Sequence, residues 1–284
     1  MKKWFSRKLA PIIMVAPTTV WMILFIFIPM IIVLIVSLVR KDTGGGIIYE
    51  LSGNGYAEMF KIEYLRIILK SLWVALEATV ICLALGYPFA FIISKLPKKY
   101  INFCVMLIML PFWINSVIRI YGWDTLLRDE GVLNKLLMSW HIIKHPIVMM
   151  KTEGAVLFGL VYELLPFMVL PLYTSISKLD NSMVEASADL GATRPRTFTR
   201  VVLPLTMPGI FAGSIQTFIP ALGLFYIGDM MGGARYMYIG NLINNQFGSG
   251  RNWPLGAALS IFLIVLTLVM MRQYAKVGNL EDMA

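Results

Sequence analysis

Long apolar runs, each near the length that crosses a lipid bilayer, constrain this chain more than any other feature. A bilayer core of roughly 30 Å takes about 20 helical residues at 1.5 Å each. Of the whole chain, 58% is hydrophobic and only 14% is charged, which is outside the range of soluble domains. The sequence predicts an all-α, polytopic membrane protein of one transmembrane domain, residues 1–284, with about six helices near 11–39, 71–93, 101–121, 154–173, 207–227 and 254–271.

Between these helices we expect polar connections. Residues 40–70 are predicted to form a turn-rich loop followed by a short interfacial helix at 58–66. Residues 122–152 and the glycine-rich stretch after residue 227 are also expected to be loops.

Basic residues orient the chain. The link at 94–100 is short and lysine-rich, which indicates the cytoplasmic side. Four basic residues precede the first apolar run: Lys2, Lys3, Arg7 and Lys8. The run is too long for a signal sequence and lacks a cleavage site, so we expect a retained first transmembrane helix. Lys and Arg are otherwise divided almost evenly between the two sides. Both termini are therefore predicted to be cytoplasmic.

Several chemistries find no support in the sequence. The net charge of +9 is scattered between apolar runs, which argues against nucleic-acid binding. Cys82 and Cys104 lie inside apolar segments, and no third ligand accompanies His141 and His145, so no metal site is expected. There is no GxxxxGK[ST] phosphate loop and no catalytic cluster, so we expect a chain that is not an enzyme and binds no cofactor itself.

A polar interruption at 185–204 separates the fourth and fifth apolar runs. Asp180, Asn181 and Ser182 are good helix N-caps, and Gly191 can end the short amphipathic helix that follows. Its acids would be costly in lipid but suit a cleft on a partner protein. We therefore predict an exposed docking helix within a cytosolic loop at about 176–206.

This interruption resembles the EAA loop of ABC-importer permeases, which reads E-A-A, then Gly, then I-x-L-P. The matching residues are 185–187, Gly191 and 201–204, with departures at Ser187 and Val201. Between about residues 69 and 258 the chain also resembles the permeases of spermidine/putrescine importers. The passages that carry this resemblance are GYPFA at 86–90, PFW at 111–113, IRIYG at 118–122, LPFMV at 165–169, PLTMPGI at 204–210, GLFY at 223–226 and MGGA at 231–234.

The resemblance implies a type I ABC-importer permease in a bacterial cell membrane that imports polyamines. Its implied partners are a second permease, two cytosolic ATPase subunits that bind ATP and Mg, an extracytoplasmic solute-binding protein and membrane lipid. The implied ATPase-coupling residues are Glu185, Ala186, Ser187, Asp189, Leu190 and Gly191. Two alternatives stay open: a permease for another small solute, such as an amino acid, iron or a sulfonate, or a stand-alone secondary transporter, which would not need the docking helix.

A polyamine path must replace water around ammonium groups with carboxylates and aromatic faces. Glu163, near the middle of the fourth helix, is one candidate, although pairing with another helix or subunit explains it equally well. Asp229 is another, because it follows Phe225 and Tyr226 near a helix interruption at Pro220 and Gly223.

Further candidates for the path have simpler explanations beside the functional one. Glu77 lies in the second helix, where packing accounts for it as well. Asp124, with Tyr121 and Trp123, would suit an outer cation mouth, but interfacial anchoring also explains these aromatic residues. Asn115 and Ser116 are expected to join helices rather than contact a ligand.

Overall fold

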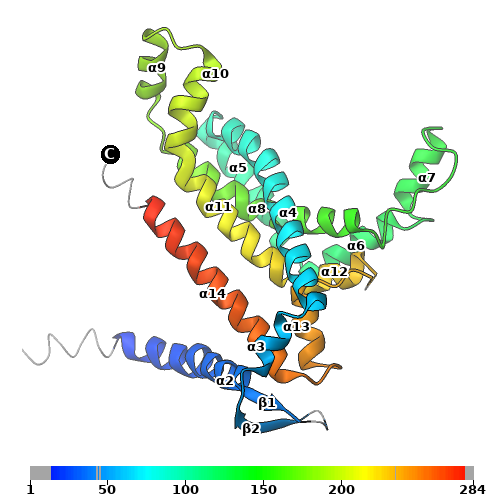
Figure 1. Ribbon diagram of the computed structural model, residues 1–284. Helices are drawn as coiled ribbons and strands as arrows, with labels where there is room; N and C mark the ends of the chain where they lie inside the picture. The colour runs from blue at the N-terminus through cyan, green and yellow to red at the C-terminus, as the bar shows by residue number, and fades with distance from the viewer. Residues whose placement is uncertain (1–13, 43, 45, 234, 279–284) are drawn as a thin grey trace, which may run out of the picture. The chain divides into compact units, whose positions relative to one another are not determined.

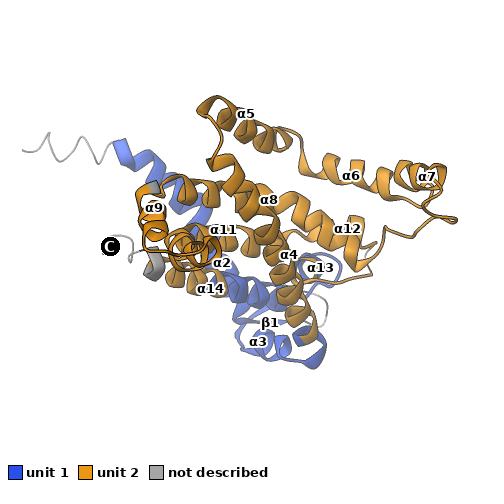
Figure 2. Cartoon of the chain, turned by 90° about the horizontal axis from the view of Figure 1, so that it is seen from above, with its two compact units in different colours: residues 1–65, 243–265 blue, residues 66–242, 266–284 orange. Residues whose placement is uncertain are grey.

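The computed structural model describes residues 14–42, 44, 46–233 and 235–278. The chain divides into two compact units, residues 1–65 with 243–265, and residues 66–242 with 266–284 (Figure 2). Residues 2, 3, 7 and 8, whose positive charge orients the chain in the sequence, lie outside the described residues.

Five helices among the described residues are long and apolar enough to span a membrane: Met14–Ser37, Ile62–Ser94, Glu153–Ser177, Arg194–Gly223 and Trp253–Ala275. The pair Lys98–Trp113 and Ser116–Ser139, bent by 91°, makes a sixth if its two helices are counted as one span. These spans confirm the predicted all-α, polytopic class.

The first unit holds the first span and a small hairpin. Residues 14–22 are helical and continue into the π-helical η1 (Ile23–Phe27) and α2 (Ile28–Ser37). Strands β1 (Val39–Lys41) and β2 (Ile47–Leu51) pair antiparallel, with Lys41 opposite Ile47, and α3 (Asn54–Met59) follows.

The prediction of a loop and an interfacial helix over residues 40–70 is therefore wrong in detail. The segments on either side of the glycine-rich turn pair as the strands β1 and β2. Residues 62–66, predicted as part of an interfacial helix, instead begin the long helix α4 (Ile62–Ser94). Within the same unit, the amide of Asn252 donates to Glu58 Oε2 over 3.0 Å, and Tyr56 OH and Ser37 Oγ are 2.8 Å apart.

The second unit is built on three helices, α4 (Ile62–Ser94), α8 (Glu153–Ser177) and α11 (Leu203–Gly223). Helices α8 and α11 lie side by side over much of their length (Figure 1). Glycines permit this close approach, since a Cβ at Gly209 would lie 2.9 Å from Pro171 O and one at Gly213 would lie 3.0 Å from Met168 O. The core of this unit lies along α8, where Met168 and Leu172 are fully buried.

Two of the predicted membrane helices are broken. Instead of one helix at 101–121, the chain forms α5 (Lys98–Met109), the 3-10 turn η2 (Leu110–Trp113) and α6 (Ser116–Leu127). Pro111 has no N–H to continue the ladder, and the side chain of Asn115 caps α6 by accepting from Val117 N. The helix expected at 207–227 likewise ends at Gly223, and α12 (Phe225–Met231) follows the break at Leu224.

Short helices occupy segments that the sequence predicted as loops. These are α7 (Val132–Ser139) and α13 (Ile239–Phe247). The last helix, α14 (Trp253–Gly278), runs beyond its predicted end at residue 271. The polar interruption folds into α9 (Asn181–Asp189), α10 (Arg194–Thr197) and the π-helical η3 (Phe198–Val202), which continues into α11 (Figure 1).

Candidate functional site

Helix α9 forms as its sequence predicts. Asp180 Oδ1 accepts a 2.9 Å hydrogen bond from Ser182 N, which satisfies one of the free amides at the helix start. That backbone N–H holds the pKa of the Asp180 carboxyl below its usual range. Gly191 follows the helix with φ +77°, a left-handed conformation that favours glycine.

The residues predicted to couple to an ATPase lie on this helix and its end. Most of their side chains are exposed, and Leu190 is 89% exposed although it is apolar. Ser187 differs, because it is half-buried and its hydroxyl lies 2.8 Å from Thr197 Oγ1 on α10. The structure therefore fixes α9 against α10 through Ser187 and leaves the face formed by Glu185, Ala186, Asp189, Leu190 and Gly191 open.

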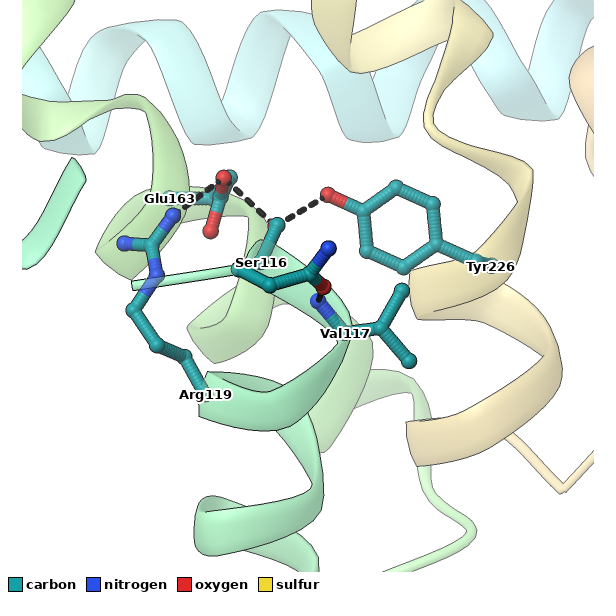
Figure 3. A network of polar contacts seen from close by, with 6 residues as sticks. Ser116, Val117, Arg119, Glu163 and Tyr226 are labelled. Atoms are coloured by element: carbon teal, nitrogen blue, oxygen red, sulfur yellow. Dashed lines mark hydrogen bonds and ion pairs between the residues drawn. The ribbon is translucent and has the colours of Figure 1, made fainter. Parts of the chain in front are cut away.

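A second site lies where both broken helices meet α8. Glu163 on α8 is only 7% exposed, and its Oε1 accepts from Arg119 Nη2 over 2.8 Å. Ser116 Oγ donates to the same oxygen over 2.7 Å. Figure 3 shows these side chains converging on one carboxylate. Both members of the ion pair are at least nine-tenths buried, so each charge depends on the other.

The network extends to the other helix break through a hydroxyl. Tyr226 OH, at the start of α12, lies 2.6 Å from Ser116 Oγ (Figure 3). Since Ser116 gives its only hydroxyl proton to Glu163, the tyrosine must donate to the serine. One chain of hydrogen bonds thus ties α12 to α6 and α6 to α8. Ser116 therefore joins helices as predicted, whereas Asn115 caps its own helix by accepting from Val117 N.

A pocket of about 340 Å³ adjoins this network, a size typical of small-ligand sites. Its walls combine apolar side chains with the buried ion pair: Phe112, Ile114, Asn115, Ser116, Arg119, Glu163, Leu164, Phe167, Pro220 and Leu224. Two buried polar atoms of the pair, Glu163 Oε2 and Arg119 Nε, have no hydrogen-bond partner among the described residues. The ion pair beside the pocket therefore keeps one unused acceptor and one unused donor, both of them buried.

Aromatic rings surround the guanidinium of Arg119. Its Cζ lies 5.4 Å from the ring centre of Phe112 and 5.6 Å from that of Tyr162, within the range of cation–π attraction. Phe112 also packs edge-on against Phe167, with ring centres 5.3 Å apart. These rings therefore surround a cation that the chain itself supplies.

The other predicted path residues lie apart from the ion pair. Trp123 packs edge-on against Phe158 and Tyr162, Asp124 is ion-paired with Arg128, and Tyr121 is 58% exposed. Glu77 is half-buried on α4. Among the described residues, Glu163 and Tyr226 are thus the members of the predicted set that share the Ser116 network.

Asp229, predicted to lie on the substrate path, makes a contact within the protein. Its Oδ1 accepts from Asn241 Nδ2 over 2.7 Å, and the same amide donates to Phe225 O over 2.8 Å. Asn241 thereby holds both ends of α12. Asp229 remains exposed, so it is available to solute as well as to Asn241.

Arg119 was not predicted as the partner of Glu163. In the sequence it was noted only within IRIYG at 118–122, one of the passages that carry the resemblance to polyamine permeases. The available signal was an arginine inside an apolar run, since an ionisable side chain at membrane depth is expected to have a charged partner.

The fold and this site define the class of protein. The model of the family described as "Binding-protein-dependent transport system inner membrane component" matches residues 2–278. The chain belongs to this family. It is a multi-pass, non-catalytic permease subunit of an ABC importer.

Curated relatives narrow the class to the PotB type. The chain is 45% identical over 260 residues to the spermidine/putrescine transport system permease protein PotB of Haemophilus influenzae, covering 92% of this chain and 91% of that protein. It is equally similar to PotB of Escherichia coli K12, with 92% and 94% covered.

Solved structures agree on the fold. A bacterial ABC transporter involved in the import of alginate aligns with a TM-score of 0.76 at 20% identity, over 98% of this chain and 99% of that one.

Proposed function

We propose that this chain imports polyamines such as spermidine and putrescine, as one of two permeases in an ATP-driven importer. The observation that carries the proposal is the 45% identity to PotB over nearly the whole chain. The site supports it too, because a buried carboxylate beside aromatic rings is the environment that an ammonium group needs when it leaves water.

Helix α9 is the proposed contact for the ATPase. Its exposed face carries Glu185, Asp189 and Leu190, and two acids on a short exposed helix suit a cleft on a partner protein better than lipid. The partners would be a PotC-like second permease, two PotA-like ATPase subunits that bind ATP and Mg, and a PotD-like solute-binding protein. In this arrangement α9 and both termini face the cytoplasm.

The connection between α9 and the pocket follows the chain. Helix α9 is fixed to α10, which continues through η3 into α11, and α11 packs closely on α8, the helix of Glu163. ATP-driven closure of the ATPase pair would therefore move α8 and α11 together. The two permeases would then alternate between outward-open and inward-open states around the substrate path.

The test is uptake of radiolabelled spermidine by proteoliposomes that contain this chain with a PotC-like permease, a PotA-like ATPase and a PotD-like binding protein. Uptake should require ATP on the ATPase side and the binding protein on the other, and excess putrescine should reduce it. Uptake without nucleotide would instead indicate a secondary transporter. Transport of an amino acid, iron or a sulfonate in place of spermidine would refute the polyamine assignment.

A further inference from the structure

We propose that Arg119 is an internal competitor for the substrate, and that an ammonium group of the polyamine exchanges with it at Glu163 during transport. The identity of the substrate rests on the proposed function. The exchange itself rests on the geometry of the ion pair.

The ion pair is incomplete. A guanidinium can bind both oxygens of a carboxylate with two parallel hydrogen bonds. Here a single contact joins Arg119 Nη2 to Glu163 Oε1, while Arg119 Nε and Glu163 Oε2 have no hydrogen-bond partner among the described residues (Figure 3). Glu163 therefore keeps an unused acceptor, and because this oxygen is buried, a ligand in the pocket reaches it only when Arg119 moves aside.

The pocket gives an ammonium group more than the carboxylate. An ammonium has three N–H donors. The hydroxyl oxygen of Ser116 lines the pocket as a further acceptor, and the rings of Phe112 and Phe167 offer apolar contact to a methylene chain. No other acidic or basic side chain of α6, α8, α11 or α12 lines this pocket among the described residues.

Charge balance favours exchange over simple addition. Glu163 and Arg119 neutralise each other, so a bound ammonium would add a net positive charge. Two positive charges at such short range repel strongly inside a protein, where the effective dielectric constant is lower than that of water. Movement of Arg119 away from the carboxylate relieves this repulsion, and the faces of Phe112 and Tyr162 already lie within cation–π distance to receive it.

The exchange also works in reverse. When the ammonium leaves, Arg119 returns, and Glu163 is never left as an unpaired buried charge, which would be costly. The arginine thus helps to release the substrate. Because Arg119 and Ser116 both lie in the first turn of α6, the exchange would loosen the contact of α6 with α8 at the helix break.

The experiment measures equilibrium binding of radiolabelled spermidine to the assembled permease–ATPase complex, without nucleotide and without the binding protein. Arg119→Gln removes the competitor and should tighten binding at least tenfold. Glu163→Gln removes the acceptor and should weaken it at least tenfold. Arg40→Gln is the matched control, since it makes the same change in the exposed ion pair with Glu50 and should leave the affinity unchanged.

Opposite changes in spermidine affinity in the two variants support the exchange. A purely structural ion pair predicts equal changes in affinity or no change, and either result would overturn the proposal. If Arg119→Gln does not assemble, the double variant Arg119→Gln with Glu163→Gln leaves no buried charge unpaired. It should assemble and lose spermidine binding, and binding like that of the unchanged chain would overturn the proposal. Absence of spermidine uptake by the unchanged complex would refute the proposed function alone, because the opposite shifts in binding would still establish the ammonium site.

Discussion

Substitution of Gly209 tests whether close packing of α8 and α11 links the coupling helix to the pocket. A Cβ at this position would lie 2.4 Å from Ser175 Cβ and 2.9 Å from Pro171 O. A serine side chain can rotate, but its Cβ and the proline carbonyl are fixed to the backbone of α8. Gly209→Ala should therefore push the two helices apart.

The size of the effect follows from two opposing contributions. Overpacking costs about 1–3 kcal/mol, and Gly to Ala in a helix gains about 0.5–1 kcal/mol. Gly122 on α6 provides the control, because nothing lies within 4 Å of a Cβ built there. The helix-forming gain is common to both variants, so Gly209→Ala should be less stable than Gly122→Ala by the overpacking cost of about 1–3 kcal/mol.

The free energy of unfolding is measured by SDS titration in mixed micelles, followed by circular dichroism. In the reconstituted importer, Gly209→Ala should also hydrolyse more ATP per spermidine imported, since α11 no longer moves α8 faithfully. Equal stabilities of the two variants, with unchanged coupling, would refute the reasoning about this helix pair.

Three other predictions concern α9 and α12. Gly191→Val should lower the free energy of unfolding by about 1–2 kcal/mol through the positive φ alone, and it should raise the number of ATP molecules hydrolysed per spermidine imported. Gly191→Asn should have a smaller effect, because asparagine tolerates this conformation. Equal coupling in both variants would contradict the role of this turn. Asp180→Ala should speed hydrogen exchange in residues 181–189, and Asp180→Asn should do so less, because an amide oxygen still accepts the hydrogen bond but carries no charge. Because folding lowers the pKa of Asp180, its cap is complete above the ordinary carboxyl pKa, and protection of α9 should fall as the pH drops through the lowered value; protection independent of pH would contradict the cap. Asn241→Ala leaves Phe225 O without its donor and should destabilise the protein by about 1–3 kcal/mol in the same SDS titration; an unchanged midpoint would show that α12 does not depend on this contact.

The parts of the fold that depend on local pattern could be predicted from sequence. The apolar runs predicted the spans, and Asp180 and Gly191 predicted both ends of α9, because caps act on neighbouring backbone groups. The exposure of the residues at 185–191 that were assigned to coupling was also predicted, apart from Ser187, which turns toward Thr197.

Features that depend on contacts distant in sequence could not be predicted. The pairing of Arg119 with Glu163 joins residues 44 positions apart, and neither position alone reveals the other. The breaks at 114–115 and at Leu224 were only partly visible, since Pro111 and Pro220 are compatible with a kink as well as with a break in the helix. The hairpin β1–β2 was missed because strands of three and five residues carry too little alternation to detect.

The most direct test of the account is a cross-link from the exposed end of α9. Leu190→Cys is made in a chain whose Cys82 and Cys104 are replaced by alanine, and the assembled importer is treated with a short thiol cross-linker. A cross-link to the ATPase subunit, blocked by a membrane-impermeant thiol reagent only when that reagent reaches the cytoplasmic side, is the predicted result. Labelling of residue 190 from the outer side, or no cross-link to the ATPase in an active importer, would contradict it.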